Sequence, residues 1–174
     1  MTDLRYPIGR FQQPERVAPA ERTLLVKQIA ACPAELRRAV AGLDRAQLDT
    51  PYRPDGWTVR QVVHHVPDSH INAYVRMKLA LTEDAPAIKT YEEARWAELP
   101  DVEATAPEVS LALLESLHAR WTTLLTALRP EQFGRTFRHP ELGPVTLDAA
   151  IALYAWHGRH HVAHVTSLRA RMGW

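Results

Sequence analysis

The chain has 174 residues, of which 46% are hydrophobic and 24% are charged, and its formal net charge is +1. A chain of this length makes one ordinary domain, and its apolar content excludes an intrinsically disordered protein. We therefore expect a single domain over residues 1–174. The near balance of charge excludes the strongly basic surface of a nucleic-acid-binding domain, so no nucleic-acid partner is expected.

The cysteine content and the hydropathy pattern indicate where such a protein resides. A single cysteine, Cys32, excludes both a disulfide framework and a cysteine-rich zinc module, which is typical of a reducing compartment. The N-terminus has no apolar core of the kind that a signal peptide needs. The longest apolar run, residues 149–156, is far shorter than the ~20 residues that cross a bilayer. We expect a cytoplasmic protein without a membrane partner.

The first part of the chain predicts an arm followed by a helix. Residues 1–18 contain several turn-forming residues and predict an extended N-terminal arm. A helical pattern starts near Pro19, with apolar residues at helical spacing. Pro33 interrupts this pattern and predicts a kinked or restarted helix, since proline breaks a helix interior. The helix is expected to continue to Val40 and to end at Gly42.

The second helix is expected to follow a loop rich in turn residues at 49–57. Thr58 predicts the N-cap of a long helix from Val59 to about Leu81, in which valines at helical spacing form one apolar face. Pro67 lies inside this helix and should kink it.

The rest of the chain predicts two more helices. Residues 82–106 lack strong periodicity and predict a long crossover, after which a third helix covers Pro107 to about Leu128. A final helix opens near Thr146 and runs to about Met172. No alternating strand is expected anywhere in the chain. Four helices with one long crossover predict an all-α four-helix bundle, a fold that commonly builds metal sites from side chains on facing helices.

Histidines are concentrated in two short segments of the chain, which together hold seven of the nine. On the final helix, His157 with His161 and His160 with His164 have the i, i+4 spacing that lets two imidazoles reach one ion. His157 and His161 fall within the apolar stripe that faces the core, whereas His160 and His164 fall toward its edge. The spacing therefore favours His157 and His161 as metal ligands.

The second histidine segment contains His64, His65 and His70 on the Val59–Leu81 helix. By ideal helical angles His70 lies nearest the valine face, and His65 lies about 120° from its centre. The register can shift across the kink expected at Pro67, and a bundle helix faces two neighbours. The spacing leaves His65 and His70 as equal candidates for a third ligand, and it favours a surface position for His64.

Three imidazoles with an open position would suit zinc, nickel or another divalent ion in a catalytic rather than a closed structural site. Such an ion lowers the pKa of a bound water or activates a bound thiol. The sequence has no His-Glu-x-x-His motif of a zincin protease. It also lacks the Gly-x-Ser-x-Gly elbow of a serine hydrolase.

These residues lie in stretches that resemble the DinB-like superfamily, and within it the YfiT-like metal-dependent hydrolases. The matching stretches are Leu4-Arg-Tyr-Pro-Ile-Gly, Asp49-Thr-Pro-Tyr-Arg, Gly56-Trp-Thr-Val-Arg-Gln-Val-Val-His-His-Val, Asp68-Ser-His-Ile-Asn, Tyr154-Ala-Trp-His, His160-His-Val-Ala-His and Arg171-Met-Gly-Trp. The resemblance implies a DinB/YfiT-type bundle whose metal is held by one histidine of the second helix and two of the last. Carried over, these are His65, His157 and His161. It also implies zinc, or alternatively nickel, and a cytoplasmic homodimer.

Three functions remain open at this point. The first is a metal-dependent hydrolase acting on a small molecule through metal-activated water, with Asp68, His64 and His160 as candidates for proton transfer. The second is a thiol S-transferase that conjugates bacillithiol or a similar low-molecular-weight thiol to electrophiles. It predicts a cationic pocket formed by arginines among Arg53, Arg60, Arg76 and Arg159. The third is a metal-binding bundle without catalysis, which a fourth protein ligand such as His160 or His70 would favour.

Overall fold

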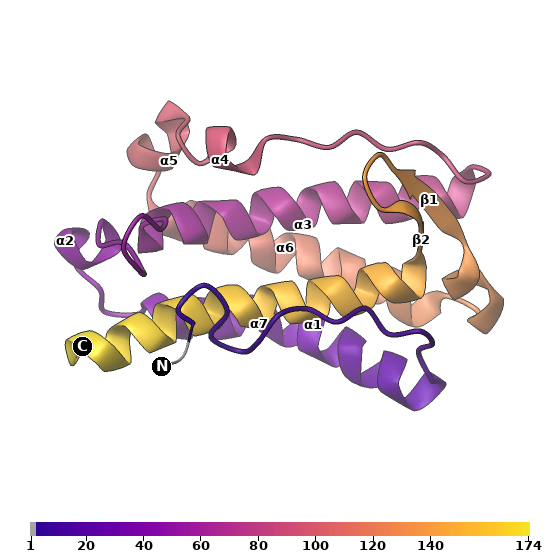
Figure 1. The fold of residues 1–174 in the computed structure, drawn as a ribbon, viewed down its shortest axis with the longest axis horizontal. Coiled ribbons are helices and arrows are strands. Elements are labelled where there is room, and N and C mark those ends of the chain that lie inside the picture. Colours follow the sequence, from indigo (N-terminus) through magenta and orange to yellow (C-terminus); the bar gives the residue numbers. More distant parts are fainter. Residues whose placement is uncertain (1–2) are drawn as a thin grey trace.

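The computed structural model describes residues 3–174, so the first two residues of the predicted arm lie outside the described part. Four long helices form a bundle: α1 (Pro19–Val40), α3 (Val59–Thr82), α6 (Pro107–Ala127) and α7 (Leu147–Met172). Helices α1 and α7 run in one direction and α3 and α6 in the other (Figure 1). Each helix packs against two others, in the ring order α1, α7, α3, α6. The predicted all-α four-helix bundle is confirmed.

Helix ends follow the capping residues that the sequence offers. The Thr58 side chain accepts a hydrogen bond from the Gln61 amide, and the Gln61 side chain accepts one from the Thr58 amide, which makes a capping box at the start of α3. Thr146 caps α7 through the Ala149 amide. Gly173 ends α7 in the left-handed conformation, with φ of +72°, where a residue without a Cβ meets no penalty.

The two internal prolines do not break their helices. Helix α1 runs as one element through Pro33, and α3 runs as one element through Pro67. Of the kinked or restarted helix predicted at Pro33, the restart does not occur. Because Pro33 has no N–H, the carbonyl of Ile29 lacks its usual helical donor. His118 of α6 supplies a replacement, with Nδ1 donating to the Ile29 oxygen at 2.6 Å. A tertiary hydrogen bond thus compensates for what the proline removes.

The crossover between α3 and α6 contains two short helices, α4 (Glu93–Trp96) and α5 (Pro100–Ala104), which contact α3. In Figure 1 it lies along the outer side of α3 and returns the chain to the end of the bundle where α3 begins. This return is why α3 and α6 run parallel. Helix α2 (Arg45–Leu48) and a 3₁₀ helix, η1 (Pro130–Gly134), complete the helical elements.

A short hairpin precedes α7, and the expectation of no strand is wrong here. Strands β1 (Thr136–His139) and β2 (Gly143–Thr146) pair antiparallel, with Phe137 opposite Val145. Each strand has four residues, and Phe137 and Val145 are the buried residue of each, so the pattern is too short to show alternation.

Histidines separate the bundle core into two apolar halves. On α3, Val66 belongs to one half and Ala73 to the other, and His70 lies between them with no exposed surface. His118 occupies the same level on α6 and is also buried. None of the helices within residues 3–174 is both long and apolar enough to cross a bilayer.

Candidate metal centre

His65, His157 and His161 converge in the middle of the bundle. His157 and His161 lie on successive turns of α7, and His65 faces them from the antiparallel helix α3. The Nε2 atoms of His65 and His157 are 3.3 Å apart, and one ring nitrogen from each of the three histidines lies within 4.8 Å of the other two. The structure therefore brings together His157 and His161, which the spacing favoured, and His65, which the family resemblance implied.

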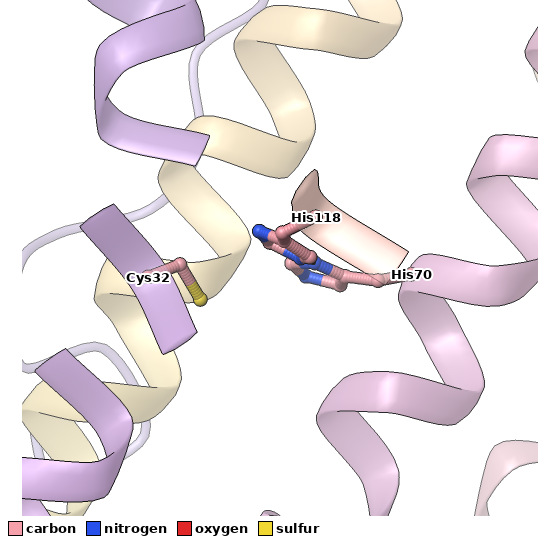
Figure 2. A group of neighbouring side chains, drawn as sticks. All are labelled: Cys32, His70 and His118. Atoms are coloured by element: carbon pink, nitrogen blue, oxygen red, sulfur yellow. The ribbon is translucent and has the colours of Figure 1, made fainter. Parts of the chain in front are cut away.

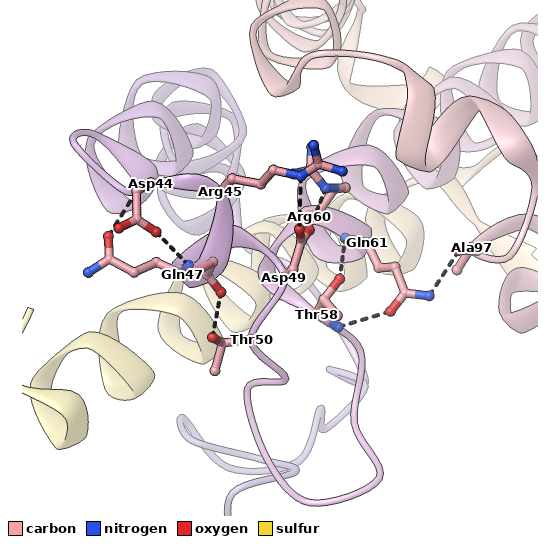
Figure 3. A network of polar contacts seen from close by, with 10 residues as sticks. Asp44, Arg45, Gln47, Asp49, Thr50, Thr58, Arg60, Gln61 and Ala97 are labelled. Carbon is pink, nitrogen blue, oxygen red and sulfur yellow. Dashed lines mark hydrogen bonds and ion pairs between the residues drawn. The ribbon is translucent and has the colours of Figure 1, made fainter.

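Polar contacts fix the loop before α3 and the start of that helix, next to the histidine cluster (Figure 3). Gln61 completes the α3 capping box and also donates to the carbonyl of Ala97 in the crossover at 2.9 Å. Arg60 binds the Asp49 carboxylate at 2.6 Å. Trp57 belongs to the same loop, where its carbonyl accepts a hydrogen bond from the Tyr52 amide at 3.0 Å. Its ring centroid lies 4.6 Å from that of His65 and 6.5 Å from that of His161. Trp57 thus forms a wall of the histidine cluster.

Burial keeps these imidazoles neutral near pH 7. It lowers the pKa of His65 to about 4. For His157 and His161, burial together with the neighbouring histidines lowers the pKa well below its ordinary value. Neutral imidazole is the form that binds a metal ion, because only it offers a lone pair.

The cluster fits a divalent ion. Two histidine nitrogens bound at 2.0–2.1 Å to a tetrahedral zinc ion lie about 3.3–3.4 Å apart, and the observed separation of His65 Nε2 and His157 Nε2 is 3.3 Å. In addition, the buried Nδ1 of His161 has no hydrogen-bond partner among residues 3–174. Three neutral nitrogen donors are the ligand set of many catalytic zinc sites.

A second group consists of Cys32, His70 and His118 (Figure 2). It adjoins the first cluster through His70 Nε2, which lies 3.0 Å from His157 Nδ1, but it is organised differently. The nitrogens His70 Nδ1 and His118 Nε2 are only 2.7 Å apart, which is a hydrogen-bond distance and shorter than two zinc ligands adopt. Burial raises the pKa of the Cys32 thiol to about 12, so it is not a ready thiolate ligand. This second group is a hydrogen-bonded support for the first and does not have the character of a metal site.

A cavity of about 430 Å³ opens beside the three histidines, which all line it. Trp57 and Tyr154 also line it, and its apolar wall consists of Phe137, Leu142, Val145, Ala150 and Leu153. Arg76 and Glu93 are the charged side chains that line it within the described part of the chain. The cavity can therefore hold a small, largely apolar molecule next to the histidines.

The other predicted site residues lie elsewhere. Asp68 does not line this cavity, and burial together with Asp101 raises its pKa to about 6. His160 lines a separate cavity of about 390 Å³ under the N-terminal arm and stacks on Trp156 at 4.3 Å. The expected surface position of His64 is wrong, because it is buried and its Nδ1 lies 2.7 Å from Ser110 Oγ.

The arginines named for a cationic pocket are dispersed. Arg76 lines the cavity beside the histidines, and Arg53 lines the smaller cavity. Arg60 is bound to Asp49, and Arg159 donates to the carbonyl of Ala155 in its own helix.

Sequence reasoning missed two side chains that the fold brings to this centre. His118 was not singled out because a lone histidine on α6 has no distinguishing spacing. Glu93 belongs to the crossover, where no periodicity indicates which residues face the bundle. The one signal that could have pointed to His118 was Pro33, since it leaves a helical carbonyl in need of a donor from another helix.

Comparison with known proteins identifies the family of this chain. The sequence profile of the DinB superfamily matches residues 28–165. Proteins from Bacillus cereus (strain 03BB102) and Bacillus mycoides (strain KBAB4), both named "Putative metal-dependent hydrolase", are each 56% identical to this chain, with 100% of both chains covered.

Solved structures give the same relationship. YfiT from Bacillus subtilis, described as "a probable metal-dependent hydrolase with an unusual four-helix bundle topology", matches with a TM-score of 0.96 and 49% identity over 99% of each chain. TT2238, a four-helix bundle protein, matches with a TM-score of 0.59 and 21% identity over 88% of this chain and 99% of its own, which shows the fold alone. With the family profile, the relatives and the shared bundle in agreement, this chain belongs to the DinB superfamily and is YfiT-like within it.

Proposed function

We propose that the protein is a metal-dependent hydrolase whose divalent ion, most simply zinc, is held by His65, His157 and His161. The observation that carries the proposal is the convergence of three neutral imidazoles at a cavity of about 430 Å³. The relatives named as metal-dependent hydrolases support the same class of activity. Nickel has the same preference for imidazole and is the alternative ion.

Three protein ligands leave a position for water or substrate, as in catalytic zinc sites. When bound, the ion supplies Lewis acidity and lowers the pKa of a water ligand to about 7. Glu93 lines the cavity and is the candidate to accept a proton there. Trp57 limits the access of bulk water to His65 and His161.

The cavity supports a small substrate with an apolar portion. Its wall includes aliphatic and aromatic side chains from the hairpin and α7, and Ser69, Arg76, Glu93 and His139 add polar groups to the lining. We propose a small ester, amide or related acyl compound, placed with its apolar part against this wall and its reacting carbon toward the histidines.

Thiol S-transfer remains the second candidate, and one observation favours it. His161 lines both cavities, and the smaller one carries Arg5 and Arg53. A low-molecular-weight thiol that bears carboxylates could therefore lie on one side of the proposed ion and an apolar electrophile on the other.

Metal analysis tests the proposed ligands first. Protein purified without chelators is measured by elemental analysis as wild type and as the His157→Ala and His160→Ala variants. His160 is the matched control, because it is a buried histidine on the same helix that does not belong to the ligand cluster. We expect one divalent ion per chain in wild type and His160→Ala, and none in His157→Ala. Wild-type protein that takes up no ion even after incubation with zinc or nickel would exclude the proposal.

Activity assays then separate the candidate functions. Hydrolysis of small chromogenic esters and amides that depends on the ion supports the hydrolase. Turnover of monobromobimane that requires an added thiol supports the transferase. An ion that binds stoichiometrically while neither reaction exceeds the His157→Ala background would favour a metal-binding bundle without catalysis.

A further inference from the structure

Three imidazoles, the buried His70 and His118 and the partly buried His157, connect the ligand cluster to the backbone of α1. His157 Nδ1 lies 3.0 Å from His70 Nε2, and His70 Nδ1 lies 2.7 Å from His118 Nε2. His118 Nδ1 in turn lies 2.6 Å from the carbonyl oxygen of Ile29. Figure 2 shows the middle of this row, where the His70 and His118 rings lie nearly parallel, with an interplanar angle of 12°.

The direction of the hydrogen bonds is set at the α1 end of the row. A carbonyl oxygen can only accept, so the proton of the first bond must lie on His118 Nδ1. The Ile29 carbonyl is free to accept it because the residue four positions later is Pro33, which has no N–H to donate. The proline inside α1 thus creates the acceptor on which the row ends.

With neutral rings, this direction passes from one imidazole to the next. His118 carries its proton on Nδ1, so its Nε2 accepts, and His70 must donate from Nδ1. His70 Nε2 then accepts, so His157 must donate from Nδ1. The lone pair of His157 is left on Nε2, which is the atom that faces His65 Nε2 at 3.3 Å.

We infer that His70 and His118 are positioning residues for the metal centre, which hold His157 in the tautomer protonated on Nδ1 so that Nε2 presents its lone pair to the ion. This inference rests on the proposed function, since it assigns a role toward the same ion. An imidazole without such a partner distributes its proton over both nitrogens and can rotate. Removing an outer partner of a metal-bound histidine typically weakens metal affinity by about 10–100-fold.

The inference is tested on two variants of His118. His118→Leu removes the acceptor of the His70 proton. His118→Gln can keep the direction, because its amide NH₂ can donate to the Ile29 oxygen while its carbonyl accepts from His70. Ser110→Ala is the matched control, since it breaks another buried hydrogen bond between α3 and α6, the one to His64. The readouts are the tautomer of His157, from two-bond ¹H–¹⁵N correlation spectra of metal-free protein, and the zinc dissociation constant, from competition with a chelator.

We expect the wild-type spectrum to show His157 protonated on Nδ1, and the His118→Leu spectrum to show a mixture of tautomers. Zinc should bind about 10–100-fold more weakly to His118→Leu and with nearly wild-type affinity to His118→Gln and Ser110→Ala.

A wild-type spectrum that shows His157 protonated on Nε2 would by itself overturn the inference, whatever the variants show. Unchanged zinc affinity in a folded His118→Leu would overturn it as well. Because the tautomer is read in metal-free protein, its result stands apart from failure of the wild type to bind zinc, which would count against the proposed function alone.

Discussion

Gly158 of α7 packs so closely on Cys32 of α1 that a Cβ atom at position 158 would lie 2.6 Å from the cysteine Sγ. The same Cβ would lie 3.7 Å from His70 Cε1. Glycine is therefore required here by the approach of another helix, and its φ is not in the left-handed region. Since Gly158 directly follows His157, this close packing also fixes the height of a proposed ligand relative to α1.

Gly158→Ala should destabilise the protein by about 1–3 kcal/mol through overpacking, although alanine by itself favours a helix over glycine by about 1 kcal/mol. Cys32→Ala removes the clashing sulfur. The Cβ of residue 32 would still lie 3.2 Å from the new Cβ, so we expect Gly158→Ala to cost clearly less in a Cys32→Ala background than in wild type, which makes the two changes non-additive. Urea denaturation of the four proteins measures this coupling. Additive effects of the two substitutions would show that the contact does not limit the packing of α1 on α7.

Binding of the proposed ion should stabilise the folded protein. At a free metal concentration of about 100 times the dissociation constant, the gain is about 2.7 kcal/mol. For a chain of this size, that corresponds to a rise of roughly 5–10 °C in Tm. Thermal melts with zinc and with EDTA should differ by this amount for wild type and for His164→Ala, which changes another buried histidine of α7. His161→Ala should melt at the same temperature in both solutions.

Stability of the metal-free protein should fall as the pH is lowered from about 6.5 to 4. Burial lowers the pKa of eight of the nine histidines, to about 4 for His65, His118, His160 and His164. Between these pH values the histidines of the unfolded chain bind protons, whereas those of the folded chain stay neutral. The histidines therefore contribute their full stability above about pH 6.5, and this contribution is lost as the pH falls toward 4. Each such histidine lowers the free energy of unfolding by at most about 1.4 kcal/mol per pH unit.

The carboxyl group of Asp68 has the opposite effect on the pH dependence of stability. The pKa of Asp68 is raised to about 6, so its protonation favours the folded state as the pH falls. A single carboxyl cannot offset several histidines, so the net slope should still be a loss of stability toward acid. Urea midpoints measured in EDTA between pH 4 and 7.5 check the sign. A midpoint that stays flat or rises toward pH 4 would mean that the buried rings are already protonated in the folded state.

Glu93→Gln should lower kcat/KM by about 10²–10⁴-fold if Glu93 accepts the proton in hydrolysis. The bound metal should remain, because Glu93 does not belong to the histidine cluster. Glu92→Gln is the control, since Glu92 precedes it in the crossover and does not line the cavity beside the histidines. The comparison uses the ion-dependent substrate found in the activity screen. Equal activity of the two variants would remove Glu93 from the mechanism.

Local sequence signals predicted much of the bundle. The start of α3 at Thr58, the end of α7 at Gly173 and the pairing of His157 with His161 follow from capping chemistry and helical periodicity, which depend on neighbours in the chain. The choice between His65 and His70 did not follow from spacing, and the structure shows why. Both are buried, one facing the ligand cluster and the other behind His157, because α3 packs on α6 and α7 at once.

Features that depend on distant segments were beyond local signals. His164 was expected toward the edge of the core stripe, yet the N-terminal arm covers it and the Arg5 carbonyl accepts from its Nε2 at 3.1 Å. The continuation of α1 through Pro33 depends on a donor from α6 that lies 89 residues from Ile29 along the chain. The single-domain organisation and the homodimer remain predictions, and light scattering of the purified protein would measure the latter.

Because the Ile29 carbonyl that Pro33 leaves without a helical donor binds His118, the proposed metal centre depends on all four long helices. The proposed ion would draw ligands from α3 and α7, and the imidazole behind them depends on α6 and on the α1 backbone. Two or three docked helices would offer nitrogen atoms but no fixed proton positions. High-affinity metal uptake would then coincide with the last helix to dock, so that zinc occupancy during refolding marks the completion of assembly.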